Sequence, residues 1–135
     1  MRIKSRKVVI IGAGHVGSHA GYALAAQGLA EEIVYIDVDK KKAKAQVYLS
    51  HRVVVKVGDY SDAADAELMV IAAGPLPDIN QTRMDTLGDT VKIMKDVVEN
   101  IKESGFGGII VSISNPADVI AHYIQNQLNY PPERI

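Results

Sequence analysis

The sequence contains no cysteine, no tryptophan and only one phenylalanine. Without cysteine, the chain has neither disulfide bonds nor thiolate metal sites. Its apolar runs are far shorter than the roughly 20 residues that a membrane-spanning helix needs. With 15 basic and 16 acidic residues the net charge is -1, so no general field attracts nucleic acid or an anionic membrane. These absences predict a soluble cytoplasmic protein whose binding depends on local geometry.

The 135 residues are enough for one domain with a proper core, and no second domain fits. Apolar runs recur at 8–11, 33–36, 53–57, 68–72 and 109–113. They are continuous rather than alternating, which is typical of parallel strands buried on both faces. Helices are expected between and after them, at 15–27, 40–49, 83–103 and 117–127. This alternation predicts the α/β class and a Rossmann-type, doubly wound parallel sheet.

The third expected helix carries apolar residues at spacings of three and four, which predicts one buried stripe. The stripe consists of Met84, Leu87, Val91, Met94, Val98 and Ile101. Core packing is the expected use of its methionines.

A glycine pattern, Gly12-x-Gly14-x-x-Gly17, directly follows the first apolar run. Glycines cluster in many turns, so an ordinary strand-turn-helix remains an alternative. Here, however, Asp37 ends the next apolar run, where a ribose hydroxyl needs an acceptor. Gly12 would permit the tight turn, Gly14 the approach of a pyrophosphate, and Gly17 close packing of the helix. The pattern therefore predicts a dinucleotide site with the phosphates at a helix N-terminus.

Asp37 can accept both hydroxyls of an adenosine ribose and repels a 2'-phosphate, which favours NAD over NADP. Asp39 is interpreted as a helix cap. The lysine run that begins at Lys40 is typical of a solvated helix face, although one lysine contacting the adenosine phosphate stays open. His15 and His19 are spaced i, i+4 without a third ligand, so no metal site is expected.

The segment from Gly74 to Arg83 is polar and interrupted by proline, which indicates a mobile loop. Ligands of open α/β sheets bind at the carboxyl ends of the strands, so this loop and the turn at Asn115 should face the cofactor. Arg83 is either an exposed helix arginine or the group that polarises a substrate carbonyl. Asn115 either caps the last helix or contacts a ligand.

Taken together, these segments resemble the N-terminal half of the L-lactate/malate dehydrogenase family, most of all bacterial L-lactate and L-2-hydroxyisocaproate dehydrogenases. The resemblance covers essentially the whole chain. It rests on residues 12–18 (GAGHVGS), Asp37, 58–62 (GDYSD), 72–75 (AAGP), 81–85 (QTRMD) and 113–118 (ISNPAD).

The resemblance implies an NAD-dependent enzyme that moves hydride between the cofactor and a 2-oxo or 2-hydroxy acid, as a homo-oligomer in its full-length form. It implies Arg83 as the catalytic arginine that polarises the substrate carbonyl, and Asn115 as a second substrate contact. The implied NAD contacts are Gly12, Gly14, Val16, Gly17, Asp37, Lys42, Gly74 and Asn115.

The sequence departs from the family pattern in three places. The substrate-selecting loop position aligns with Pro77 instead of glutamine or arginine, which weakens any assignment to malate or pyruvate. The stretch 42–58 is about eight residues shorter than the resemblance leads us to expect, with the shortfall placed between Tyr48 and Val53. The family's catalytic His-Asp pair is expected beyond Ile135, so residues 1–135 are expected to be a dinucleotide-binding domain without its substrate domain, inactive alone.

A second functional class stays open at this point. Regulatory domains that sense nucleotides also pair such a glycine turn with an acid and need no catalytic loop. The residues around Arg83 and Asn115 favour the dehydrogenase.

Overall fold

The computed structural model describes residues 6–47 and 53–135, and within these ranges it contains one five-stranded sheet in the order β3-β2-β1-β4-β5. All four pairings are parallel. The strands are β1 (Lys7–Ile11), β2 (Glu32–Ile36), β3 (Val54–Val57), β4 (Leu68–Ile71) and β5 (Ile109–Ser112). After β3 the chain crosses to the other side of β1, which places the topological switch point between β1 and β4.

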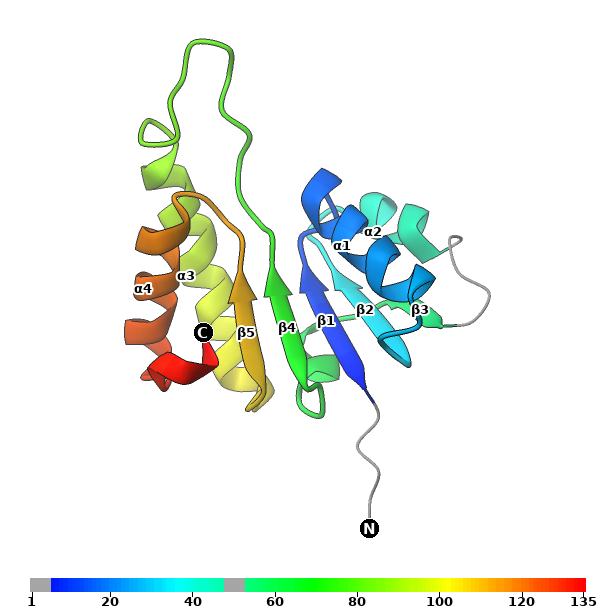
Figure 1. Cartoon of the computed structure of the whole chain (residues 1–135). Helices are drawn as coiled ribbons and strands as arrows, with labels where there is room; N and C mark the ends of the chain where they lie inside the picture. The colour runs from blue at the N-terminus through cyan, green and yellow to red at the C-terminus, as the bar shows by residue number, and fades with distance from the viewer. Residues whose placement is uncertain (1–5, 48–52) are drawn as a thin grey trace.

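Helices cover both faces of the sheet (Figure 1). They are α1 (His15–Ala26), α2 (Lys40–Gln46), α3 (Leu87–Ser104) and α4 (Ala117–Leu128), with short 3-10 helices η2 (Tyr60–Ala63) and η3 (Pro132–Arg134). Alternate side chains of β1 point into two cores. Val9 and Ile11 join residues of α3 and α4, whereas Val8 and Ile10 join residues of α1 and α2. The predicted Rossmann-type, doubly wound sheet is confirmed.

The expected start of the third helix at residue 83 is wrong, because α3 begins at Leu87. Thr82 and Asp85 hold a separate turn: the Thr82 amide donates to Asp85 Oδ2 over 2.6 Å, and the Asp85 amide donates to Thr82 Oγ1 over 3.3 Å. Met84 lies in this turn with 62% of its surface exposed, so its expected place in the buried stripe is also wrong. The remaining stripe residues pack into the core.

The second helix begins as predicted, since Asp39 accepts hydrogen bonds from the amides of Lys41 and Lys42. The helix α2 ends at Gln46. The expected helix end at residue 49 and the segment 48–52 lie outside the described residues.

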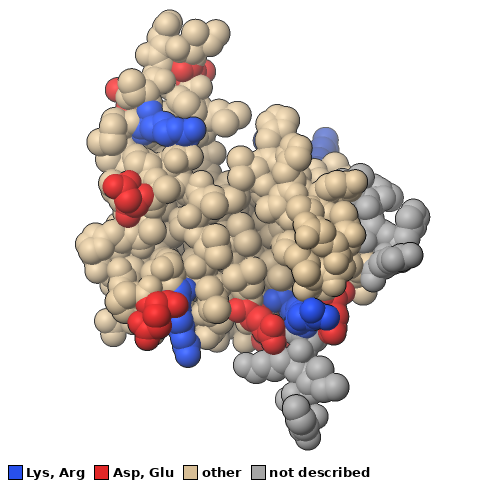
Figure 2. All heavy atoms as spheres, viewed as in Figure 1, with Lys and Arg blue, Asp and Glu red and all other residues tan. Residues whose placement is uncertain are grey.

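Charged side chains are sparse at the centre of the face shown in Figure 2 and gather along its lower edge, where the amino ends of the strands lie (Figures 1 and 2). The helix α1 adds none there, because its sequence contains no Asp, Glu, Lys or Arg. Among the described helices, none combines the length and the apolar character that crossing a bilayer requires.

Candidate dinucleotide site

The turn after β1 brings the carboxyl ends of three strands together. Gly12 has φ +98, which favours glycine, and its amide donates to the Ile36 carbonyl at the end of β2 over 2.8 Å. A Cβ added to Gly12 would lie 2.7 Å from the carbonyl oxygen of Ala72, directly after β4. Only glycine fits between these backbones, as the sequence predicts for a tight turn.

The other two glycines of the motif face very different surroundings. A Cβ on Gly17 would lie 1.8 Å from the Gly12 carbonyl oxygen, so α1 packs directly on the turn. At Gly14, no described atom lies within 4 Å of an added Cβ. Gly14 is also the N-cap of α1, where no side chain caps the helix and the first turn carries no acid. Free amides and the positive end of the helix dipole therefore face open space, an arrangement that suits an anion such as pyrophosphate.

Asp37 is fixed in place at the end of β2 by two backbone amides. Its Oδ2 accepts from Ala13 over 2.7 Å, and its Oδ1 accepts from Asp39 over 2.8 Å. Since an ionised carboxylate has about four lone-pair sites, roughly two remain for ligand hydroxyls. The sequence indicated Asp37 as a ribose acceptor but not that its carboxylate also holds the glycine turn.

A cleft of about 690 Å³ runs along these strand ends. Five of the residues that the sequence proposed for the cofactor line it: Gly12, Gly14, Asp37, Lys42 and Gly74. The far part of the cleft is lined by Tyr60 and by Asp96 and Asn100 of α3, which sequence reasoning did not assign to the site. The cleft thus extends from the glycine turn, past Asp37, to α3.

The sequence profile of the lactate/malate dehydrogenase NAD-binding domain matches residues 6–135. The chain belongs to this family. An L-lactate dehydrogenase 3 of Bacillus cereus is 39% identical over all of this chain, and an L-lactate dehydrogenase of Staphylococcus epidermidis is 38% identical. In both cases the match covers 45% of the relative, so the chain spans about half the length of the curated relatives it matches.

Solved structures agree with this family membership. The minor L-lactate dehydrogenase from Enterococcus mundtii, in its ligands-bound form, superposes with a TM-score of 0.88 at 35% identity and covers 98% of this chain. A lactate dehydrogenase from a Medee basin deep-sea metagenome library gives 0.86 at 37% identity over 98% of this chain. These matches cover 45% of each solved chain. The comparisons give no support to the regulatory alternative.

The alignment with one relative can be compared with the expected shortness of the stretch 42–58. The Bacillus cereus relative aligns over 143 positions, eight more than this chain has, which agrees with the expected shortfall of about eight residues. The proposed place of the shortfall, between Tyr48 and Val53, falls largely outside the described residues.

Four of the residues that the family resemblance implied do not line the cleft. Gly17 is buried beneath the turn, and Val16, on α1, is 59% exposed. Asn115 is exposed in the turn before α4. Arg83 is exposed on the long loop between β4 and α3, which projects beyond the strand ends in Figure 1.

The alternative of Asn115 as a helix cap is wrong. The N-cap of α4 is Pro116, and no side chain caps this helix. Instead, the neighbouring Ser114 ties the turn to the site, because its buried hydroxyl donates to the Ala73 carbonyl over 2.6 Å. Asn115 is thereby held beside the strand end that leads to Gly74.

Tyr60 is placed in the cleft by a tightly constrained turn. Asp59 and Asp62 form a reciprocal capping box around η2, and a Cβ on Gly58 would lie 2.3 Å from Asp62 Oδ2. Burial, together with the nearby carboxylates of Asp96 and Asp37, raises the pKa of Tyr60 to about 12. Its phenol is therefore protonated at neutral pH and can donate a hydrogen bond.

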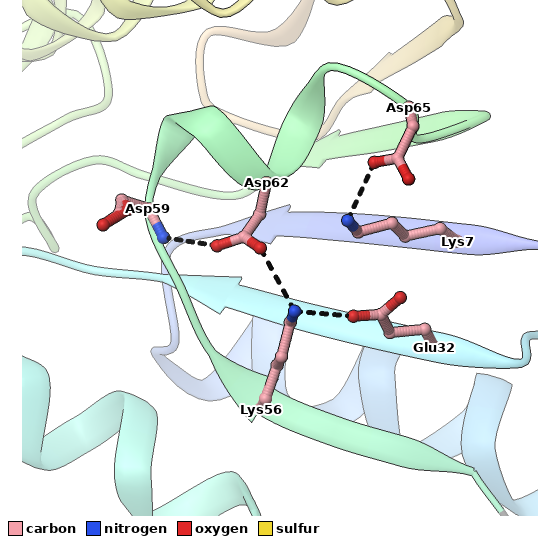
Figure 3. Close-up of polar contacts among 6 residues, drawn as sticks. All are labelled: Lys7, Glu32, Lys56, Asp59, Asp62 and Asp65. Atoms are coloured by element: carbon pink, nitrogen blue, oxygen red, sulfur yellow. Dashed lines mark hydrogen bonds and ion pairs between the residues drawn. The ribbon is translucent and has the colours of Figure 1, made fainter.

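An ion-pair network holds this turn to the sheet (Figure 3). Lys56 of β3 lies 2.8 Å from Glu32 of β2 and 3.1 Å from Asp62. Partial burial acts to raise the pKa of Asp62, but the hydrogen bond from the Asp59 amide and the pairing with Lys56 outweigh it and lower the pKa. Lys7 pairs separately with Asp65 over 2.9 Å. The network thus positions the residue that lines the far part of the cleft.

Proposed function

We propose that this chain binds NAD(H) as the coenzyme-binding part of an NAD-dependent L-2-hydroxyacid dehydrogenase. The observation that carries the proposal is the open space at Gly14, where the uncapped α1 N-terminus adjoins the fixed carboxylate of Asp37. The cofactor's nicotinamide supplies or accepts the hydride in such a reaction. The full-length protein would interconvert a 2-oxo acid and the corresponding L-2-hydroxy acid.

The cleft suggests which residues of the chain would contact each part of the dinucleotide. Pyrophosphate would lie against the α1 amides at Gly14, and Asp37 would accept the adenosine ribose hydroxyls. The base would then extend toward Tyr60, beyond the ribose. Gly74, after β4, would adjoin the nicotinamide half. The proposed contacts are Gly12, Gly14, Val16, Gly17, Asp37, Lys42, Gly74 and Asn115.

The substrate residues belong to the same proposal. Arg83 would polarise the carbonyl of the 2-oxo acid, and Asn115 would contact the substrate beside it. Arg83 lies outside the cleft in this structure, so a closing movement of the loop must bring it over the nicotinamide. A cytoplasmic, homo-oligomeric full-length enzyme remains part of the proposal, and the oligomeric state in solution is directly measurable.

Cofactor titration tests the role of Asp37. A 2'-phosphate roughly 4 Å from this carboxylate would cost about 1 to 4 kcal/mol, so NADP should bind at least about five-fold more weakly than NAD. Asp37→Ser should reduce the difference between the dissociation constants of NAD and NADP. Asp39→Asn is the matched control, because it removes a charge two residues away while asparagine still caps α2. Equal dissociation constants for the two cofactors in the wild-type chain would remove Asp37 from its assigned role.

A further inference from the structure

We propose that Met84 is a site of reversible oxidation by peroxide, and that its sulfoxide weakens the closing of the loop that carries Arg83. Where it concerns Arg83, the proposal rests on the proposed function, because it takes this arginine to reach the substrate by a movement of the loop. The oxidation itself depends only on the chemistry and the exposure of Met84.

The sulfur atoms of this chain all belong to methionines. The sequence has four methionines and no cysteine, so no thiol of the chain competes for an oxidant. Among the methionines that the structure describes, Met69 and Met94 are 0% exposed, whereas Met84 is 62% exposed. Exposure determines which of these thioethers an oxidant in water reaches. Peroxide should therefore react at Met84 before it reaches the two core sulfurs.

The reaction is an oxygen transfer to the thioether. The Met84 sulfur attacks one oxygen of hydrogen peroxide, the O–O bond breaks, and the other oxygen leaves as water with both hydrogens. The sulfur is oxidised by two electrons, and a flexible apolar side chain becomes a polar sulfoxide. Methionine sulfoxide reductases reverse this change, so the modification can be switched on and off.

Met84 and Arg83 share one turn, whose backbone is held at both residues. The Met84 carbonyl accepts from the Leu87 amide at the start of α3 over 3.2 Å. The Arg83 carbonyl accepts from the hydroxyl of the buried Thr86 over 3.1 Å. The two residues therefore move together when the loop closes, and a change at the Met84 side chain acts directly beside the arginine.

The loop between β4 and α3 exposes large apolar side chains to water. Leu76 is 83% exposed and Ile79 is 103% exposed, in addition to Met84. Closing of the loop over the strand ends would remove part of this apolar surface from water, which favours the closed state. A sulfoxide at Met84 would instead have to give up hydrogen bonds with water. Oxidation therefore shifts the loop toward the open state, in which Arg83 lies outside the cleft.

Peptide mass spectrometry after treatment of the folded chain with dilute hydrogen peroxide tests the modification site. Trypsin cleaves after lysine and arginine, so Met69 and Met84 fall in separate peptides, 57–83 and 84–92. Peptide 84–92 should gain one oxygen at least about ten-fold faster than peptide 57–83, because the buried sulfur reacts only when the structure opens. In urea above the unfolding midpoint the two rates should become equal. Equal rates in the folded chain would overturn the assignment of Met84.

Steady-state kinetics of the full-length enzyme test the effect on the loop. Peroxide should lower kcat/KM for a 2-oxo acid such as pyruvate about five-fold and leave the dissociation constant of NADH unchanged, because Met84 does not line the dinucleotide cleft. Methionine sulfoxide reductases should restore kcat/KM. Met84→Leu is the matched control, since leucine is apolar and has no sulfur, so peroxide should leave this variant at its untreated activity. Met84→Gln should show the loss without peroxide, because its amide is polar.

The outcomes separate this proposal from the proposed function. If the wild type and Met84→Leu lose activity equally in peroxide, the effect arises elsewhere, so the role of Met84 in the loop is overturned and the dehydrogenase function stands. Full activity of an enzyme whose peptide 84–92 carries the added oxygen would overturn that role as well. If the full-length protein reduces no 2-oxo acid with NADH, the proposed function is overturned together with the effect on Arg83, while the peptide rates still decide whether Met84 is the oxidation site.

Discussion

The same substitution at two glycines of the motif should separate binding from folding. Gly14 has φ -72 and ψ -167, which alanine adopts without strain, and no described atom lies within 4 Å of an added Cβ. Gly14→Ala should therefore fold normally with near wild-type stability, because the gain of about 0.4 to 1 kcal/mol from the restricted unfolded chain is offset by the poorer ranking of alanine at a helix N-cap. The methyl group would, however, occupy the space in which a pyrophosphate approaches α1. Loss of one charge-assisted hydrogen bond, about 1.5 to 3 kcal/mol, would weaken NAD binding at least ten-fold.

Gly17→Ala should have the opposite effect. Its Cβ would lie 1.8 Å from the carbonyl oxygen and 3.0 Å from the carbonyl carbon of Gly12, and 3.3 Å from a methyl group of Ile10. The first two are backbone atoms, so α1 would have to move away from β1. Overpacking of this kind typically costs about 1 to 3 kcal/mol, and a backbone overlap of this size should reach the upper end.

Urea denaturation and NAD titration of the wild type and both variants provide the comparison. We expect a near wild-type midpoint with weak binding for Gly14→Ala, and a lowered midpoint for Gly17→Ala. Wild-type NAD affinity in Gly14→Ala would show that the phosphates do not approach the α1 N-terminus. A wild-type midpoint in Gly17→Ala would refute the close packing of α1 on the turn.

Three further substitutions test other parts of the structure. Lys56→Met should cost about 1 kcal/mol at pH 7, because the Lys56 ion pairs are only half-buried and water still screens them. Since the pKa of Asp62 is lowered in the fold, its share of that difference should be fully present above its ordinary value of 3.8 and should decline as the pH falls from 3.8 through the lowered value, so urea denaturation should give a smaller difference at pH 3 than at pH 7. Ser112→Ala should raise the free energy of unfolding, measured in urea, by up to about 1 kcal/mol, because within the described residues the buried Ser112 Oγ has no hydrogen-bond partner; a lowered free energy of unfolding would contradict this. In a full-length enzyme, Pro77→Arg should raise turnover of oxaloacetate relative to pyruvate several-fold, because a cation at the loop can pair with a second carboxylate; an unchanged ratio would mean that the loop position is assigned incorrectly.

Hydrophobic continuity was sufficient to predict the sheet, because the central strands β1, β2 and β4 are buried on both faces. The edge strands β3 and β5 are partly exposed, and the run of β3 includes Lys56. The observed bounds of β1 and β2 differ from the predicted ones by a single residue at the amino end. The start of α3 was predicted four residues early because Met84 continues the helical spacing. The spacing of apolar residues indicates which of them would share a helix face. It does not predict the hydrogen bonds between Thr82 and Asp85 that form a separate turn.

The near half of the cleft was predictable because its residues are contiguous in the sequence or directly follow a strand. Gly12, Gly14 and Asp37 have roles set by local backbone geometry, and the structure places them together. Tyr60 and Asp96 belong to segments that meet only through the packing of η2 against α3. No local pattern marks such a pair, since Asp96 on its own is an ordinary exposed helix residue.

Asp37 links the two halves of the cleft, and this has a consequence for binding. Its carboxylate holds the Ala13 amide within the glycine turn while its remaining lone pairs face the cleft. The same charge helps to raise the pKa of Tyr60. The ion pair between Lys56 and Asp62 fixes the turn that carries Tyr60. Replacing Asp37 would therefore remove the proposed ribose acceptor and a support of the glycine turn at once, so binding energies measured for Asp37 and Gly14 variants should not be additive. A double variant that loses less than the sum of the two single losses would reflect this shared support, whereas strict additivity would mean that the ribose and pyrophosphate ends of the cleft act independently.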